Sequence, residues 1–260
     1  MQRGRPRLGT VRPMLTLVLT MGRVGSTATF RALKEVDGVE AFHLHHLAKE
    51  SLARWAGKAL SRHGEDTLRV RKRLVASPDE RVKVLSLVRD VVPRNLSVGF
   101  ARFRKAVGND PDKMVEMLDQ ADFLAALWRR VDWRLPFTWF DIEIRDQMSI
   151  DVFATPFPDD GIAIHRSGRF DLLVMRSDVD NREKSAAISA FLGQPIVFKQ
   201  MSVATQEGGS LRSTYDAFSA TSRWGREDLR EMGQSRVMRH FFAVTDPDRY
   251  AADWLAKLKR

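Results

Sequence analysis

The segment LTLVLTM-GRVGST-ATFRALKEV at residues 15–36 decides the fold class of this chain. Its first part, Leu15–Met21, is a short and nearly continuous apolar run, which predicts a strand buried on both faces. The glycine loop Gly22–Thr27 follows directly. Residues 28–36 then repeat apolar side chains at helical spacing, and residues 39–47 have the composition of a second strand. Strand, glycine loop, helix and strand in this order predict a βαβ unit.

Strands and helices alternate through the remaining sequence as well. We expect strands at 81–88 and 170–175 with a short one at 196–198, and helices at 93–105, 111–130, 136–148, 181–192 and 247–259. Residues 48–80 are polar, basic and helix-leaning. This alternation predicts an α/β fold of three layers, with a central parallel sheet flanked by helices. Ligands of such folds bind at the carboxyl ends of the strands.

Length and composition indicate one globular domain. The chain has 260 residues, of which 43% are hydrophobic, enough for one large core. We assign residues 14–260 to a single domain, and residues 1–13, with four arginines and no acid, to a flexible basic arm. The absence of cysteine excludes disulfides, thiolate metal sites and a cysteine nucleophile. No apolar run approaches the roughly 18 residues of a membrane span, so we expect a cytoplasmic protein without a transmembrane segment.

The net charge of +10 is unevenly distributed. Residues 54–105 carry 14 Lys/Arg against 5 Asp/Glu. This excess suits an anionic partner such as a nucleotide, a nucleic acid or, through weak contact, an acidic membrane surface, although a solvated basic face would have the same composition. The sequence has no helix-turn-helix pattern, RNA-binding signature or interleaved aromatic and basic residues. We therefore expect no specific nucleic-acid partner.

The glycine loop has the chemistry of a phosphate site. Backbone N–H groups converge where a strand, a glycine loop and a helix meet, and the helix N-terminus adds about half a positive charge. Gly22 and Gly25 let the backbone approach a phosphate, Ser26 and Thr27 add hydroxyl donors, and Arg23 adds a full charge. The spacing is too short for GxxxxGK[ST], and the lysine of that motif is absent. An ordinary tight turn is the alternative interpretation.

A second pair of polar residues follows the strand at 81–88. Arg89 lies directly at the end of this strand, on the same sheet edge as the glycine loop. Ser97 follows eight residues later, within or beside the next helix. An arginine and a serine in these places can hold a second phosphate. A salt bridge from Arg89 to Asp90 or to another acid is the alternative interpretation.

The glycine loop and the segment from Arg89 to Ser97 together resemble the sulfotransferase superfamily. In that family a strand–loop–helix unit binds the 5′-phosphosulfate of 3′-phosphoadenosine 5′-phosphosulfate, and an arginine and a serine eight positions apart bind the 3′-phosphate. The resemblance implies that the donor is bound by Gly22, Arg23, Val24, Gly25, Ser26, Thr27, Arg89 and Ser97. Arg23 stands where many members of the family have lysine.

A closer resemblance is to bacterial sulfotransferase-like proteins of capsular polysaccharide synthesis. It extends to Trp139–Glu143 (WFDIE), Ile150–Phe153 (IDVF), Leu172–Arg176 (LLVMR) and Ser235–Phe242 (SRVMRHFF), and so covers most of residues 15–256. These later segments mark the family without indicating a chemical role of their own.

Phe42–Leu47 (FHLHHL) contains three of the six histidines. If this segment continues the second strand, His43 and His45 share one face and His46 lies on the other. Histidine titrates in the range useful for removing a proton from a hydroxyl, and the resemblance places the base of sulfuryl transfer at His43 or, next, at His45. Buried hydrogen-bonding groups and a metal site are the alternatives. Because the chain has no cysteine and no evident carboxylate partner nearby, we expect no metal requirement.

The resemblance implies a sulfotransferase that moves a sulfuryl group in line to a hydroxyl, that of a carbohydrate or glycoconjugate, and releases adenosine 3′,5′-bisphosphate. His43, His45 and Arg23 would be its catalytic residues. The alternatives are a nucleotide-dependent phosphotransferase or kinase-like enzyme, a catalytically inactive sulfotransferase-like protein, and a module that binds nucleic acid or anionic lipid.

Other segments could complete such a site. Arg176 and Asp178 follow the strand at 170–175 and either face the site or form an ion pair. The glycine-rich segment Thr205–Arg212 resembles, in its position, a late loop that closes over the nucleotide in sulfotransferases. Three tryptophans either stack on sugar rings or pack a core, namely Trp55, Trp128 and Trp133.

Overall fold

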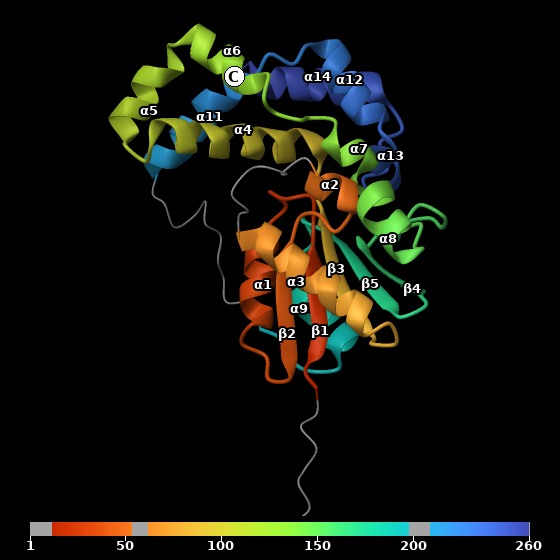
Figure 1. Cartoon of the computed structure of the whole chain (residues 1–260). Coiled ribbons are helices and arrows are strands. Elements are labelled where there is room, and N and C mark those ends of the chain that lie inside the picture. The colour runs from red at the N-terminus through yellow and green to blue at the C-terminus, as the bar shows by residue number, and fades with distance from the viewer. Residues whose placement is uncertain (1–11, 54–61, 198–208, 260) are drawn as a thin grey trace, which may run out of the picture.

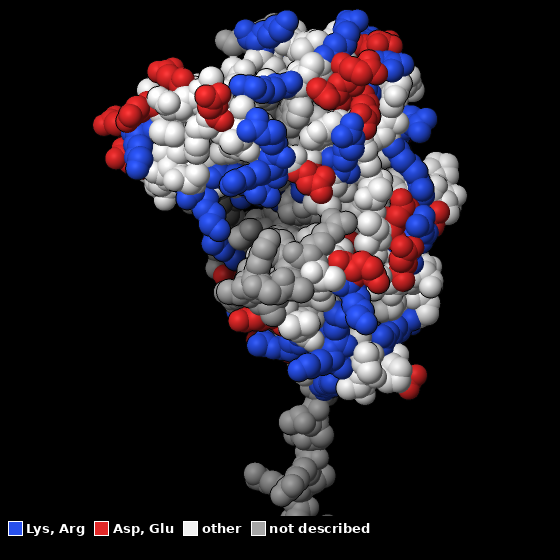
Figure 2. Space-filling view, turned by 45° about the horizontal axis from the view of Figure 1, so that its top comes forward, with Lys and Arg blue, Asp and Glu red and all other residues white. Residues whose placement is uncertain are grey.

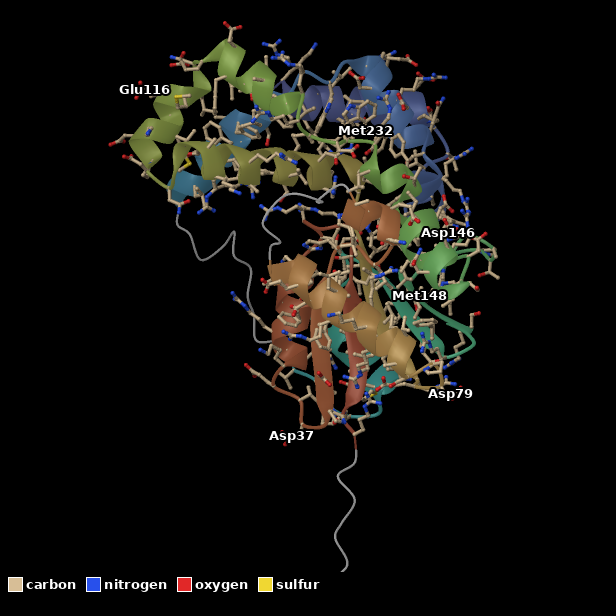
Figure 3. The ribbon with its side chains drawn as sticks, in the orientation of Figure 1. Asp37, Asp79, Glu116, Asp146, Met148 and Met232 are labelled. Carbon is tan, nitrogen blue, oxygen red and sulfur yellow. The ribbon has the colours of Figure 1, made fainter. Side chains whose placement is uncertain are left out.

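The structure is a computed structural model, and it describes residues 12–53, 62–197 and 209–259. In the view of Figure 1 a sheet with its flanking helices forms the lower part of the molecule, and a group of helices lies above the carboxyl ends of the strands. We call these the sheet part and the helical part. Figure 3 shows the same division, with Asp37 and Asp79 at the lower end of the sheet part and Glu116 and Met232 in the helical part.

The sheet has five strands in the order β2-β1-β3-β5-β4. They are β1 (Met14–Leu19), β2 (Val39–Leu44), β3 (Val82–Val88), β4 (Ile162–Ser167) and β5 (Phe170–Arg176). β2, β1, β3 and β5 are parallel, with Leu17 of β1 aligned with Phe42 of β2 and with Val84 of β3. The predicted α/β class with a central, mostly parallel sheet is thus confirmed. β4 is antiparallel to β5 at the sheet edge, and it is missing from the sequence prediction because its side chains are only partly buried.

Side chains alternate along the strands and form two buried faces. Leu17 of β1 belongs to the core on one face and Val18 to the core on the other. Helices cover both faces, namely α1 (Ser26–Leu33) and α9 (Asn181–Leu192) on the Val18 face and α3 (Arg62–Ala76) on the Leu17 face. Leu33 of α1 and Ile188 of α9 belong to the core on the Val18 face. Val70 of α3 belongs to the core on the Leu17 face. The sheet part therefore has three layers.

The helical part is built around an aromatic core. Its helices are α4 (Val91–Val107), α5 (Pro111–Leu118), α6 (Ala121–Trp128), α11 (Gly209–Ala220), α12 (Arg226–Gln234), α13 (Arg236–Phe241) and α14 (Pro247–Leu258). The ring of Phe218 lies 4.9 Å from that of Trp128 and 5.1 Å from that of Phe103, measured between centroids. Gly99 makes room for this packing, because a Cβ there would lie 2.7 Å from the Trp128 ring. Trp128 is therefore a core residue.

Several predicted elements differ in detail. The expected helix at 111–130 is two helices, because the backbone of Gln120 leaves the helical region between α5 and α6. The expected helix at 136–148 consists of α7 (Leu135–Phe140), a π-helical turn η1 (Asp141–Arg145) and α8 (Asp146–Met148). Residues 196–197 form no strand, and residue 198 lies outside the described residues. A short helix, α2 (Lys49–Ala53), follows β2.

Within the described ranges, no helix is both long enough and apolar enough to cross a membrane.

Candidate functional site

β1 leads into the glycine loop at the carboxyl edge of the sheet. Gly22, Arg23 and Gly25 have positive φ angles of 78°, 62° and 88°, a conformation that glycine adopts without strain and other residues rarely adopt. α1 begins at Ser26, and its N-cap residue Gly25 makes no side-chain hydrogen bond to the first amides of the helix. The loop therefore combines the uncapped amides of a helix N-terminus with the positive end of the helix dipole, which together favour an anion.

Arg23 joins the glycine loop to α4. Its Nε donates to the carbonyl oxygen and to the hydroxyl oxygen of Ser97, each at 3.2 Å. Nη1 of Arg89 donates at 3.2 Å to the carbonyl oxygen of Arg23. The structure thus brings together the two elements that the sequence predicts to bind phosphates, although they are 66 and 74 positions apart in the chain.

Positive charge is concentrated where these elements meet. Arg23 is exposed at the surface, yet the surrounding chain partly desolvates its guanidinium. This desolvation, followed by the positive charges of Arg89 and Arg104, lowers the pKa of Arg23. Figure 2 shows Lys and Arg side chains gathered beside a hollow below the helical part. The electrostatics of this region therefore favour a ligand with negative charge.

Asp90 directs its hydrogen bonds to groups other than Arg89. Its Oδ1 accepts the hydroxyl of Tyr250 at 2.7 Å and the backbone amide of Val92 at 2.9 Å, so it caps α4 and attaches α14 to it. Burial raises the pKa of Asp90. In the part of the chain that the structure describes, Arg89 forms no ion pair, and its guanidinium donates to the carbonyl oxygen of Arg23.

His43 supports the loop from beneath. Its Nε2 lies 2.8 Å from Oγ of Ser26, and this hydroxyl also accepts a 3.1 Å hydrogen bond from Oγ1 of Thr20. Burial, followed by the two neighbouring histidines, lowers the pKa of His43 to about 3, so the ring is neutral at pH 7. Ser26 is only 4% exposed, and its hydroxyl is directed inward to Thr20 and His43. Thr27, by contrast, is exposed.

His45 lies just beyond the end of β2, against the glycine loop. A Cβ on Gly22 would lie 3.6 Å from its ring. Nδ1 lies 3.0 Å from the carbonyl oxygen of Thr20, and a carbonyl accepts, so Nδ1 carries the ring proton. Burial, followed by the nearby His63, lowers the pKa of His45 to about 4. Nε2 is therefore unprotonated at pH 7, and it has no hydrogen-bond partner among the described residues.

His46 lies on the opposite face, as strand alternation predicts. The rings of His43 and His45 are 5.0 Å apart between centroids, whereas Nδ1 of His46 lies 3.1 Å from Oε1 of Glu143. Glu143 is the carboxylate partner that is not evident in the sequence, because 97 positions separate it from His46.

The Trp139–Glu143 segment holds the chain that follows β2 in place. Glu143 is 1% exposed, and it accepts the backbone amide of Ala48 at 2.8 Å and the hydroxyl of Ser51 at 2.5 Å. Burial alone would raise the pKa of Glu143, but its hydrogen bonds lower it. Nε1 of Trp139 donates at 3.0 Å to the carbonyl oxygen of His45. The available sequence signal is the spacing of four residues, which places Trp139 and Glu143 on one helical face.

The remaining predicted residues lie as follows. Arg176 and Asp178 form an ion pair, with 3.1 Å between Nε and Oδ1. Trp133 carries the guanidinium of Arg134 at 3.9 Å from its ring centroid. Trp55 and residues 205–208 lie outside the described residues, and residues 209–212 are the first turn of α11.

α11 brings Tyr215 to the arginines of the site, a contact that the sequence does not indicate. Its ring meets that of Phe100 edge-on, with 5.1 Å between centroids. Burial raises the pKa of Tyr215, and the charge of Arg89 opposes this effect. Tyr215 therefore lies within electrostatic range of Arg89.

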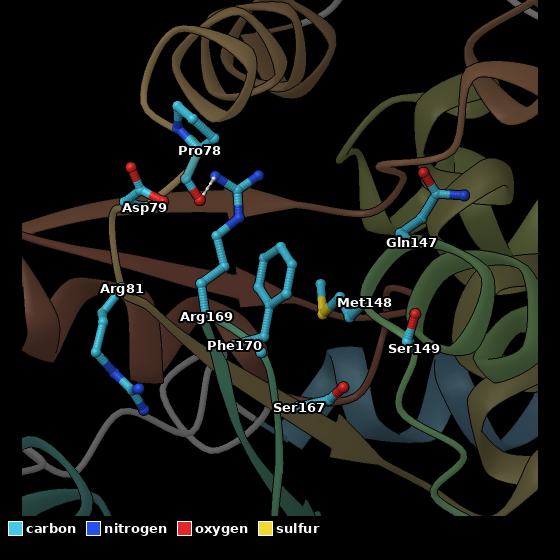
Figure 4. Close-up of a pocket in the computed structure, with 10 residues that line it drawn as sticks. Pro78, Asp79, Arg81, Gln147, Met148, Ser149, Ser167, Arg169 and Phe170 are labelled. Atoms are coloured by element: carbon cyan, nitrogen blue, oxygen red, sulfur yellow. Dashed lines mark hydrogen bonds between the residues drawn. The ribbon is translucent and has the colours of Figure 1, made fainter.

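A separate depression lies at the opposite, amino end of the sheet (Figure 4). Its lining includes Pro78, Asp79, Arg81, Gln147, Met148, Ser149, Ser167, Arg169 and Phe170. Nη1 of Arg169 is occupied by the carbonyl oxygens of Leu74, Ser77 and Pro78 at 3.0, 2.8 and 3.0 Å, and Nη2 of Arg81 lies 2.7 Å from Oδ1 of Asp171. Its cations therefore hold the fold together, and it is remote from the glycine loop.

Over the described ranges, no group of three or more His, Cys, Asp or Glu side chains has an arrangement that could hold a metal ion. Comparison of the chain with protein-family models, with curated proteins and with solved structures finds no match. A function for the chain is therefore inferred from the residues of the site and their geometry.

Proposed function

We propose that the chain is a sulfotransferase that transfers a sulfuryl group from 3′-phosphoadenosine 5′-phosphosulfate to a hydroxyl of a carbohydrate or glycoconjugate. The observation that carries the proposal is the contact of Arg23 with both Ser97 and Arg89. This contact places the N-terminus of α1, which favours an anion, next to a second group that can hold a phosphate. That group is Arg89 with Ser97, and we call it the clamp. A nucleotide with phosphates at both its 3′ and 5′ positions matches such a pair. The domain would then have the P-loop-like fold of sulfotransferases.

The charges around the loop support a ligand with several negative charges. Arg89 and Arg104 are close enough to Arg23 to lower its pKa. Such mutual repulsion is relieved when anionic groups bind between the cations. The donor carries a 3′-phosphate and a 5′-phosphosulfate, so it would neutralise more of this cluster than a single phosphate would.

His45 is the residue best placed to take the proton of the acceptor hydroxyl. The Thr20 carbonyl orients its ring, and the Nε2 lone pair is available at pH 7. As the acceptor oxygen bonds to sulfur, its proton passes to Nε2 and the bond from sulfur to the bridging phosphate oxygen breaks. An anion bound beside the ring would raise the low pKa of His45, because negative charge favours the imidazolium. His43, which is bonded to Ser26, would instead support the loop.

Arg23 and the N-terminus of α1 would stabilise the charge that develops on the leaving phosphate. Arg23 is held in place by Ser97 before any ligand arrives. Donors that are already oriented need no rearrangement in the transition state, and such preorganised groups contribute much of the rate enhancement of enzymes. The leaving group is adenosine 3′,5′-bisphosphate.

Calorimetry with adenosine 3′,5′-bisphosphate tests the nucleotide site. We expect this ligand to bind and to raise the melting temperature more than ATP with Mg²⁺ or ADP does. A folded protein that does not bind it contradicts the proposal, and stronger stabilisation by ATP with Mg²⁺ indicates a phosphotransferase. Transfer of radiolabelled sulfate from the donor to a panel of polysaccharides then tests the activity. Bisphosphate binding without transfer to any acceptor indicates an inactive sulfotransferase-like protein.

A further inference from the structure

Arg94 is a buried arginine directly beneath the glycine loop. It belongs to α4 and is only 4% exposed. Nη2 donates at 2.9 Å to the carbonyl oxygen of Met21, the residue that precedes Gly22. Nη1 donates to Oδ1 of Asn95 at 2.8 Å and to the carbonyl oxygen of Asp132 at 3.4 Å. The guanidinium therefore connects the start of the loop to the helical part.

No carboxylate of the described residues forms an ion pair with Arg94. Among the described residues its acceptors are two carbonyl oxygens and an amide oxygen, and Nε is buried there without a hydrogen-bond partner. The carboxylate of Asp132 attracts the charge of Arg94, but Asp132 itself is exposed at the surface. Burial is the main cause that lowers the pKa of Arg94, to about 10, which leaves the group charged at pH 7. A buried charge without a paired counterion is destabilising, so a role beyond folding is expected of it.

We infer that Arg94 is a positioning residue of the anion site, which orients the Met21 carbonyl at the start of the glycine loop and supplies a positive charge that the bound 5′-phosphosulfate neutralises. The inference rests on the proposed function for the identity of that anion. Its structural basis is the contact with Met21, which places the cation next to the loop that carries the uncapped amides of α1. A cation behind the loop attracts the anion without contacting it, and the interior screens this attraction less than water does.

The geometry also explains why an arginine occupies this position. One guanidinium reaches Met21, between β1 and the glycine loop, and the segment after α6 at the same time. The neighbouring Asn95 donates from Nδ2 to the carbonyl oxygen of Trp133 at 2.9 Å, so two consecutive residues tie α4 to the same segment. A lysine would keep the charge but has no planar fork to bond both ends.

Three variants and a control test the inference. Arg94→Met removes the charge and all donors, Arg94→Gln removes the charge but keeps an amide donor, and Arg94→Lys keeps the charge. Arg182→Met removes a charge from an exposed position of α9 and serves as the control. Melting curves and calorimetry are recorded with adenosine 3′,5′-bisphosphate, adenosine 5′-monophosphate and pyrophosphate.

We expect Arg94→Met and Arg94→Gln to bind the bisphosphate at least tenfold more weakly, Arg94→Lys to lose clearly less affinity than either because it keeps the charge, and Arg182→Met to stay within about threefold of the wild type. Adenosine 5′-monophosphate should lose affinity by the same factor, because Arg94 lies behind the 5′ site. If Arg94→Met or Arg94→Gln is folded and binds both nucleotides as the wild type does, Arg94 is only structural and the inference is wrong.

The pyrophosphate arm separates this inference from the sulfotransferase proposal. If the wild type is stabilised by pyrophosphate but not by the bisphosphate, and Arg94→Gln loses that stabilisation, the role of Arg94 at an anion site stands and the nucleotide proposal fails. If the wild type responds to neither ligand, both fail. Should Arg94→Met not fold, the comparison of Arg94→Gln with Arg94→Lys decides, because the two differ in charge.

Discussion

Arg23 and Ser97 are 74 positions apart in the chain, and Nε of Arg23 donates to both the carbonyl and the hydroxyl oxygen of Ser97 at 3.2 Å. Arg23 is the residue at which the glycine loop turns through a positive φ of 62°. Because the same residue also accepts a hydrogen bond from Arg89 through its carbonyl oxygen, loop and clamp form one unit. A change in either element should therefore alter binding at the other.

Replacing the clamp should weaken nucleotide binding selectively. A hydrogen bond to a charged group contributes about 1.5–3 kcal/mol, so Arg89→Ala should reduce the affinity for adenosine 3′,5′-bisphosphate by about 10- to 150-fold, and Ser97→Ala by about tenfold. Adenosine 5′-monophosphate should lose less, because it lacks the 3′-phosphate. Calorimetry measures both, with the exposed Arg182→Ala as control. Equal losses for the two nucleotides would place Arg89 at the 5′ group instead.

Alanine variants of two glycines with similar φ angles can distinguish backbone strain from an effect on nucleotide binding. Gly22 and Gly38 have φ of 78° and 73°, so alanine at either should cost about 1 kcal/mol of the free energy of unfolding. A Cβ on Gly22 would face the His45 ring, whereas one on Gly38 meets nothing within 4 Å. We therefore expect equal destabilisation in urea but loss of bisphosphate binding only in Gly22→Ala. Binding that survives in both variants would remove Gly22 from the site.

Amide substitutions can test His43 and His45 separately, because asparagine places an amide group near the position of Nδ1 and glutamine places one near that of Nε2. His45→Asn keeps a donor for the Thr20 carbonyl but removes Nε2, so turnover should fall about 100- to 10,000-fold while bisphosphate binding remains. His43→Gln keeps a group near Ser26 and should retain most of its turnover. Sulfate transfer measured at saturating donor distinguishes them. The opposite order of losses would make His43 the base.

The buried histidines should make stability depend on pH in acid. Their pKa values in the fold, about 3 for His43 and about 4 for His45, lie below the ordinary value of 6.5. Between these values the unfolded chain binds more protons, so stability is complete above pH 6.5 and falls as pH decreases, by up to about 1.4 kcal/mol per pH unit for each histidine.

Urea unfolding between pH 4 and 7 measures this slope. His43→Gln and His45→Asn should each reduce it, and the double variant should reduce it further. Burial also lowers the pKa of His165 and of His240, which contribute in the same direction in every variant. A slope that is unchanged in the double variant would mean that neither His43 nor His45 is held neutral by the fold.

Glu143→Gln should destabilise the fold, because Glu143 holds the segment that follows β2. The amide would present an NH₂ group to donors that now face a carboxylate oxygen, including the backbone amide of Ala48, and we expect a loss of about 3 kcal/mol. Glu231→Gln, which breaks an exposed pair with Arg134, should cost far less, because water screens that pair. Urea denaturation compares them. Similar losses for both would show that Glu143 is not a central support.

Local features of the sequence were sufficient to predict the βαβ unit and its loop. The apolar run at Leu15–Met21 and the helical spacing after Thr27 reflect burial that neighbouring residues share, so they are readable without a structure. Strand alternation likewise predicted that His43 and His45 share a face. β4 and the break at Gln120 were not predictable in this way, because β4 is half-exposed and the break contains neither glycine nor proline.

The sequence by itself determined the α/β class, the glycine loop and the residues that can carry charge and protons, because these follow from side-chain type and periodicity. Only the tertiary structure decided which of them meet. It set Arg23 against Ser97, turned His43 toward Ser26, left Nε2 of His45 beside the loop and buried Arg94 under Met21. Contacts between residues so distant in the chain arise from the packing of α4 and η1 against the sheet edge, and no local pattern encodes that packing.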